Sequence, residues 1–238
     1  MVKNRLKCSI FVGWFIPSVI LATGNVADEN ETSNYPEVKT LGSGIYDFGG
    51  ITIDQKSRSI SFDAVCNQTS RLVEYALVHE NGKVHESLFR TKISPKWIHA
   101  CFLLLKESPV VSPPRKQGLN GHNNELIKDR ALRVLVEWDG NGSQFSEPLG
   151  RMTIKQTNQK TLDERAFLFT GSKVIEGEYL AEMDGSIIAI YEDSRATINA
   201  IDEDNSNDDI WLANGENMPP LGKTVRIRLI LPSPAIMK

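Results

Sequence analysis

Apolar and polar residues alternate over short stretches along most of this chain, the pattern of half-buried β-strands. Glycine pairs and polar pairs separate these stretches, beginning with Gly49-Gly50 and Lys56-Ser57. Alternating or apolar runs predict strands at 45–48, 51–53, 59–62, 131–139, 150–155, 166–170, 178–182, 186–191 and 223–231. Residues 162–165 predict a short turn or helix, and residues 193–199 predict one or two helical turns.

A central hairpin is predicted over residues 71–90, which read RLVEYALVHENGKVHESLFR. Asn81-Gly82 is a strong signal for a two-residue type I′ turn, because that turn requires positive φ at both central positions. This turn would pair Leu77 with Glu86 and place both on one face. Asp139-Gly140-Asn141-Gly142 predicts a turn after the strand at 131–139, and Asp184-Gly185 predicts a second hairpin.

The more apolar face of the central hairpin would face the core, although it also carries His79 and Glu86. A buried carboxylate needs a partner. His79 lies diagonally across the predicted hairpin from Glu86. His99 is the second candidate, on an apolar helix that begins after Ser94-Pro95 and is expected to be largely buried.

Strands outnumber helices, and no regular strand–helix alternation or internal repeat occurs. We therefore expect an α+β fold with a mainly antiparallel β-sheet and one buried apolar helix after the central hairpin. A single domain is expected over residues 42–232. Within it, residues 107–130 predict a long surface loop, and residues 233–238 a C-terminal tail.

The N-terminus predicts a secretory signal peptide over residues 1–24, with a basic segment followed by an apolar run from Cys8 to Ala22. Cleavage after Gly24 is expected, and cleavage after Ala27 is the second choice. Pro17 and the shortness of the run argue against a stable membrane span. An extracytoplasmic protein, periplasmic or secreted, is thus expected, with a flexible lead-in over residues 25–41.

Composition excludes several classes of function. The formal net charge is −3 without a basic stripe, so nucleic acid is not an expected partner. No dinucleotide or phosphate-loop glycine pattern and no paired-cysteine metal motif occurs, so no cofactor is expected. Cys66 and Cys101 remain after signal removal; the sequence leaves their redox state open and favours free thiols.

Two further groups carry candidate chemistry. Lys83, His85 and Ser87 share the other face of the predicted hairpin, which raises the possibility of a serine nucleophile with a histidine base. The surrounding sequence lacks a nucleophile elbow, so a solvated face is the favoured interpretation. Asp202, Asp204 and Asp208 resemble alternate ligands of a calcium loop, but the glycine and the terminal glutamate of that loop are missing. An acidic solvated loop is favoured there.

Several segments, taken in order, resemble the YdjY-type domain of secreted bacterial proteins. They are LVEYALVHENGKVHESLFRT, WIHACFLLL, RVLVEW, FLFTGS, YLAEMDGSIIAIYED and DDIWLANGENMPPLGKTVRIRL, within residues 47–231. The resemblance implies a bacterial, extracytoplasmic protein and carries no established activity. Some such proteins look associated with iron–sulfur proteins, but this chain lacks cluster-type cysteine spacing.

The leading hypothesis is a non-enzymatic domain that binds an unknown envelope ligand or protein partner. The candidate residues are His79, Lys83, His85, Glu86, Ser87 and His99. Two alternatives stay open: a metal-dependent or Ser/His hydrolase that uses His85, Glu86 and His99, and a purely structural envelope protein.

Overall fold

The computed structural model describes residues 35–110 and 129–233. The predicted signal peptide lies outside the described residues. So do the first part of the lead-in, most of the predicted 107–130 loop and most of the tail.

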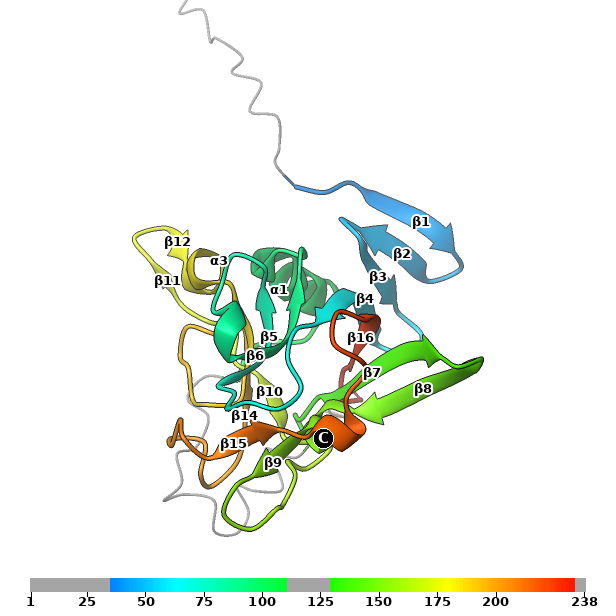
Figure 1. Ribbon diagram of the computed structural model, residues 1–238. Coiled ribbons are helices and arrows are strands. Elements are labelled where there is room, and N and C mark those ends of the chain that lie inside the picture. The colour runs from blue at the N-terminus through cyan, green and yellow to red at the C-terminus, as the bar shows by residue number, and fades with distance from the viewer. Residues whose placement is uncertain (1–34, 111–128, 234–238) are drawn as a thin grey trace, which may run out of the picture. The chain divides into compact units, whose positions relative to one another are not determined.

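The described chain is dominated by strands, with α1 (Pro95–Leu104) and the short α3 (Leu180–Asp184) as its α-helices (Figure 1). The strands are β1 (Val38–Gly42), β2 (Ile45–Phe48), β3 (Ile51–Asp54), β4 (Ser59–Cys66), β5 (Tyr75–His79), β6 (Ser87–Thr91), β7 (Arg133–Gly140), β8 (Ser143–Pro148), β9 (Thr153–Lys155), β10 (Phe167–Phe169), β11 (Val174–Ile175), β12 (Glu178–Tyr179), β13 (Ser186–Ala189), β14 (Ile198–Ala200), β15 (Trp211–Ala213) and β16 (Thr224–Ile230). Single 3₁₀ turns lie at η1 (Val84–Glu86), η3 (Leu149–Met152) and η4 (Gly215–Asn217). The expectation of an α+β fold with mainly antiparallel pairing is confirmed.

The strand pairing of the main sheet closes into a circuit. From β4 it runs through β6, β5, β13, β14 and β10. On the other side of β4 it runs through β16 to β7. A single bridge between Leu132 and Phe167 then joins the start of β7 to β10. Large buried side chains fill the core, among them Phe62, Phe89, Phe102, Phe167 and Phe169.

The early strands follow the sequence pattern closely. β2, β3 and β4 form the predicted antiparallel meander. The last residues of the expected lead-in form part of β1, which pairs with β2 and is exposed along its whole length. The predicted final strand is β16, inserted between β4 and β7.

The predicted central hairpin is wrong, because β5 and β6 are parallel and pair Tyr75 with Ser87 and Leu77 with Phe89. The Asn81-Gly82 pair does not adopt positive φ. The seven connecting residues run back along β5 instead and include η1. A five-residue strand rises about 16 Å, and seven residues reach up to about 23 Å, so the return is just possible.

The type I′ hairpin turn occurs elsewhere, at the second Asn-Gly pair. Asn141 has φ 49° and Gly142 has φ 76°, and these two residues join β7 to β8. Both positive angles are what this turn requires. The turn predicted at Asp139–Gly142 is therefore present, whereas β8, the second strand of this hairpin, was not predicted.

The segment after residue 178 also differs from the prediction. Asp184-Gly185 does not form a hairpin, because Gly185, with φ 69°, ends α3 in the left-handed conformation. β13 then pairs antiparallel with β5 and parallel with β14. Residues 193–199 form a turn leading into β14 rather than helical turns.

Helix α1 begins after Ser94, as predicted, with Pro95 at its first position. The Ser94 hydroxyl donates to the Glu182 carboxylate at 2.7 Å, and the Lys96 N–H donates to the same oxygen at 3.1 Å. A residue of α3 thus satisfies the free N-terminus of α1. The helix is less buried than expected, because the Leu103 and Leu104 side chains point into solvent and are half exposed.

Candidate functional site

The structure separates the predicted site residues into three places. Lys83, His85 and Glu86 lie on the segment that returns from β5 to β6, at or next to η1. His79 ends β5 and accepts the Asn81 N–H on Nδ1 at 3.2 Å. His99 lies on α1 and bonds elsewhere.

Glu86 is not sealed beneath the helix, which corrects the sequence-based expectation. Its side chain is one-third exposed, and its nearest basic partner is His85, 3.2 Å away and 77% exposed. The expectation failed because Glu86 precedes a parallel strand rather than pairing with Leu77 across a hairpin.

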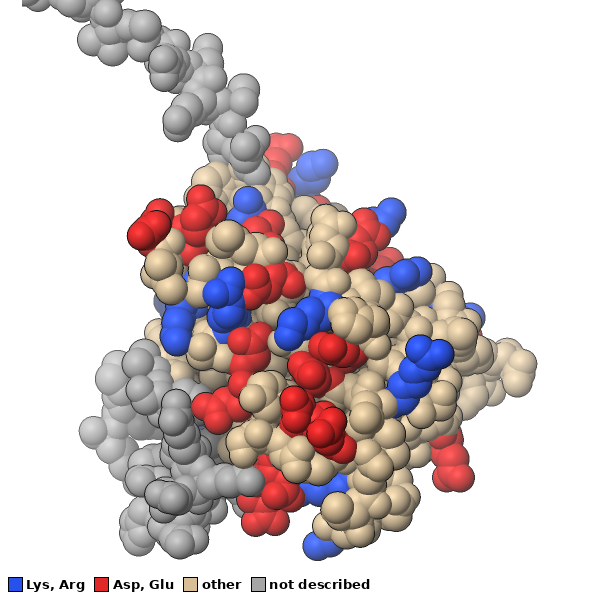
Figure 2. All heavy atoms as spheres, turned by 60° about the vertical axis from the view of Figure 1, so that its left-hand side comes forward, with Lys and Arg blue, Asp and Glu red and all other residues tan. Residues whose placement is uncertain are grey.

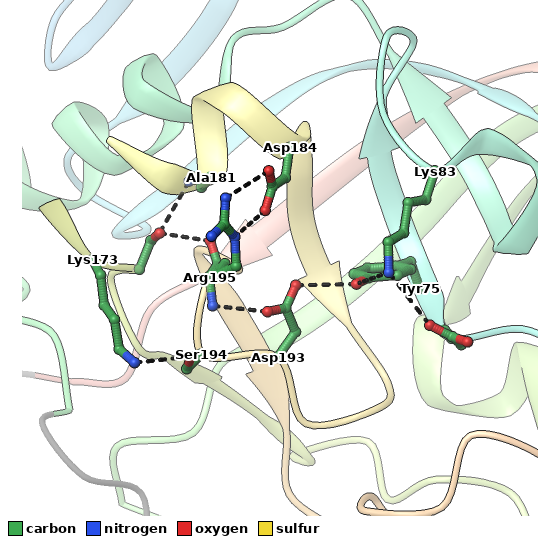
Figure 3. A network of polar contacts seen from close by, with 10 residues as sticks. Tyr75, Lys83, Lys173, Ala181, Asp184, Asp193, Ser194 and Arg195 are labelled. Atoms are coloured by element: carbon green, nitrogen blue, oxygen red, sulfur yellow. Dashed lines mark hydrogen bonds and ion pairs between the residues drawn. The ribbon is translucent and has the colours of Figure 1, made fainter. Parts of the chain in front are cut away.

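Tyr75 is the centre of a polar network that sequence reasoning missed (Figure 3). Lys83 Nζ donates to the Tyr75 hydroxyl at 3.1 Å, and that hydroxyl donates to Asp193 Oδ2 at 3.0 Å. Lys83 also pairs with Glu74 at 3.7 Å. The short return connection makes this possible, because it brings residue 83 back over the start of β5.

The network continues from Asp193 into the turn before β14. Asp193 Oδ1 accepts the backbone N–H of Arg195, and the Arg195 guanidinium pairs with Asp184 through two hydrogen bonds. The Ser172 hydroxyl donates to the Arg195 carbonyl at 2.6 Å and accepts the Ala181 N–H at 3.1 Å. This turn is thereby fixed to the end of α3.

Both groups at the centre of the network are held in their protonated forms. Burial and the neighbouring Asp193 carboxylate raise the pKa of Tyr75 to about 12, against the opposing effect of Lys83. Burial alone would lower the pKa of Lys83, but Tyr75, Glu74 and Glu86 outweigh it and raise that pKa. A protonated phenol and an ammonium can bind and position groups, but neither is a nucleophile or base at neutral pH.

Acidic side chains gather on the face of the molecule that Figure 2 brings forward. Burial raises the pKa of Glu74. The nearby Glu86 and Asp208 carboxylates raise this pKa further, while the Lys83 ammonium lowers it. We use the name "Lys83 surface" for Glu74, Lys83, His85 and Glu86, which are all partly or fully exposed.

His99 belongs to a separate cluster between α1 and β12. Its Nδ1 lies 3.1 Å from the Tyr179 hydroxyl, which is 3.0 Å from the Thr197 hydroxyl. The imidazole packs edge-on against Phe169. Burial lowers the pKa of His99, against a hydrogen bond with the Gly171 backbone. The neutral ring therefore ties β12 to α1.

Ser87 is placed away from nucleophilic chemistry. The residue is fully buried at the start of β6, and its hydroxyl donates to the Phe89 carbonyl at 3.0 Å. The hydroxyl proton is thus directed to a backbone oxygen, whereas the His85 imidazole lies in solvent against Glu86.

Comparison with models of protein families shows which family the chain belongs to. A family model described as the YdjY domain matches residues 51–230. The chain belongs to the YdjY domain family. No curated protein and no solved structure matches it.

Two of the three candidate calcium ligands of this YdjY domain, Asp202 and Asp204, are already paired with a lysine. Lys155 Nζ lies 2.7 Å from Asp202 and 2.9 Å from Asp204, and the lysine side chain is 6% exposed. An ammonium thus stands where a calcium ion would be expected, and Asp208 lies instead near Glu74. Nowhere in residues 35–110 and 129–233 do three or more His, Cys, Asp or Glu side chains come together as metal ligands.

A cavity of about 800 Å³ opens where the end of α1 meets β4, β7 and β16. No pattern in the sequence predicted this cavity, because its walls come from widely separated segments. Its basic side chains, so far as the chain is described, are Arg58, Lys106, Arg130, Arg133 and Arg165, and its acidic ones are Glu107 and Asp129.

Glu107 is the buried centre of this cavity wall, with 8% of the residue exposed. Its Oε2 accepts from Arg58 at 3.1 Å, and its Oε1 accepts from two nitrogens of Arg130 at 3.1 and 2.8 Å. Arg58 also donates to the Leu105 and Pro232 carbonyls. Two guanidinium groups therefore share one buried carboxylate.

The two cysteines of the YdjY domain are buried free thiols. Burial raises the pKa of Cys66 to about 11 and that of Cys101 to about 12. Thiols in this state are unreactive.

In the described part of the chain, no helix is both long and apolar enough to cross a bilayer.

Proposed function

We propose that this YdjY domain is an extracytoplasmic, non-enzymatic protein that binds a ligand or a protein partner, and that the Lys83 surface is a contact region. The observation that carries the proposal is the geometry around Tyr75. Burial and the Asp193 carboxylate keep the Tyr75 phenol protonated, and Tyr75, Glu74 and Glu86 keep the Lys83 amine protonated, so neither of these two central groups is a nucleophile or base at neutral pH.

The charges of the Lys83 surface also favour recognition over internal stabilisation. Burial raises the pKa of Glu74 and the nearby Glu86 raises it further, so the ionised form of Glu74 costs the isolated domain free energy. The Lys83 ammonium offsets only part of this cost while its side chain remains half exposed. A partner that supplies positive charge would relieve the repulsion, so the surface fits a basic group on the partner.

Cysteine crosslinking tests this contact region directly. His85→Cys places a reactive thiol on the Lys83 surface, whereas Cys66 and Cys101 are buried and protonated. Gln144→Cys on the exposed part of β8 is the matched control. After labelling with a benzophenone maleimide, illumination in the bacterial envelope should give a discrete adduct from position 85 and none from position 144. The adduct should be competed by unlabelled protein and not by the Glu74→Gln, Glu86→Gln double variant.

Two results would overturn the proposal. One is turnover on a panel of esters and peptides that is lost on His85→Ala. The other is an equal adduct from both labelled positions. The compartment is tested separately by the N-terminal sequence of the exported protein, which should begin at Asn25.

A further inference from the structure

We propose that the cavity around Glu107 binds an organic anion, with a carboxylate or phosphate head beside an apolar body. This deepens the proposed function by naming a ligand class, and it rests on the domain being a binding protein. It concerns a different part of the molecule from the Lys83 surface. The cavity volume of about 800 Å³ lies within the range of small-molecule sites.

The charge of the cavity wall opposes that of the whole protein. Its described walls carry five basic and two acidic side chains, whereas the complete chain has a formal net charge of −3. Like charges gathered in a concave wall repel one another and attract counter-ions from solution. An anion bound among them would remove that repulsion.

Glu107 gives this wall a fixed geometry. A buried carboxylate that accepts from both Arg58 and Arg130 holds the two guanidinium groups in place and neutralises one of their two charges. Arg130 is fixed further by donating to the Ser108 carbonyl at 2.6 Å. Preorganised arginines bind oxyanions with little loss of side-chain entropy. One net positive charge is therefore already in position before a ligand binds.

The outer basic side chains are less committed. Arg133 approaches Glu164 only to 4.0 Å, and half of its side chain is exposed. Lys106 and Arg165 are exposed, and within the described chain their side chains form no hydrogen bond or ion pair. These three cationic side chains can turn toward an anionic head group. The two guanidinium groups among them can form bidentate hydrogen bonds with its oxygens.

The apolar part of the wall argues for more than an inorganic ion. Ala131, Ile230, Leu231 and Pro232 line the same cavity. Apolar side chains beside a few placed charges are typical of sites for organic ligands. An anionic head with a hydrocarbon body would use both parts of the wall.

Titration calorimetry with defined probes tests the inference on the exported protein. Octyl phosphate and octanoate represent the two kinds of head, octanol is the uncharged control, and inorganic phosphate is the head alone. We expect saturable binding of at least one charged octyl probe, at least tenfold tighter than octanol or inorganic phosphate. The tighter of the two charged probes identifies the head.

Variants locate the site. Arg133→Gln and Arg165→Gln should each weaken binding of the tighter probe about fivefold or more, and both are exposed positions where folding is spared. Arg226→Gln, which removes the same charge from an exposed arginine paired with Asp63, should leave binding unchanged.

No saturable binding of either charged octyl probe at millimolar concentration would overturn the inference, as would equal binding of octanol or unchanged affinity in both cavity variants. A position-85 adduct alongside such a failure would leave the proposed function standing, whereas failure of both experiments would remove both.

Discussion

Gly82 and Gly185 lie backbone against backbone, and a Cβ added to Gly82 would come within 3.1 Å of the Gly185 Cα and 2.7 Å of the Asp184 carbonyl oxygen. This contact holds the segment that returns from β5 to β6 against the end of α3. The glycine of the Asn81-Gly82 pair is thus required for close packing, not for positive φ.

Gly82→Ala should therefore destabilise the domain by about 1–3 kcal/mol, because rigid backbone atoms cannot move aside cheaply. Gly42→Ala is the control, since a Cβ there meets nothing within 4 Å. It should change stability by less than about 0.5 kcal/mol. Urea unfolding curves of the two variants give the comparison, and equal midpoints would contradict the proposed contact.

Tyr75→Phe should cost about 1–2 kcal/mol of stability, because Asp193 and Lys83 lose the hydroxyl of a buried residue as their shared hydrogen-bond partner. Tyr46→Phe is the control; its hydroxyl makes no hydrogen bond within the described residues. In a double-mutant cycle with Lys83→Met, the two substitutions should be non-additive. Additive effects would show that Lys83 and Tyr75 act independently.

His99 should make the stability of the domain depend on pH. Its pKa is lowered in the folded protein from the ordinary value of 6.5, so the unfolded chain binds the proton more tightly. The contribution of the neutral His99 ring to the free energy of unfolding is complete above pH 6.5. It is lost as the pH falls from 6.5 through the lowered pKa of the folded protein. The difference in unfolding free energy between wild type and His99→Gln should shrink over that range. A constant difference between pH 7.5 and pH 5 would contradict the assignment.

Lys155→Met should destabilise the domain by about 1–3 kcal/mol, below the value for a fully buried pair because Asp204 is 42% exposed. Lys160→Met, at an exposed position, is the control. Because the Lys155 ammonium already lies between both aspartates, millimolar calcium should leave the melting temperature of the wild type unchanged. A calcium-dependent rise that is lost on Asp204→Asn would restore the calcium interpretation.

The sequence predicted the elements whose pairing is decided locally. The β2–β3–β4 meander, the turn after β7 and helix α1 follow from alternation, turn residues or capping signals within a few positions. β8 was not predicted, and β16 was predicted as a strand without its partners β4 and β7. The sequence could not decide between two uses of an Asn-Gly pair. Asn141-Gly142 forms the expected turn, whereas Asn81-Gly82 packs against a glycine 103 residues away.

The candidate site was predicted only in part, for the same reason. Lys83, His85 and Glu86 do share one surface because they are neighbours in sequence. The hydroxyl partner of His99 is Tyr179, and that of Lys83 is Tyr75, which a hairpin register would have kept apart. The arginines around Glu107 come from three separate segments, so only the fold brings them together.

The position of β16 has a consequence for how the chain reaches its native state. This last strand lies between β4 and β7, which were synthesised long before it. Until residue 230 is available, both of those strands keep an unsatisfied edge and the ring of strands stays open. Nascent chains should consequently remain incompletely folded until residues 224–230 are free to pair with β4 and β7.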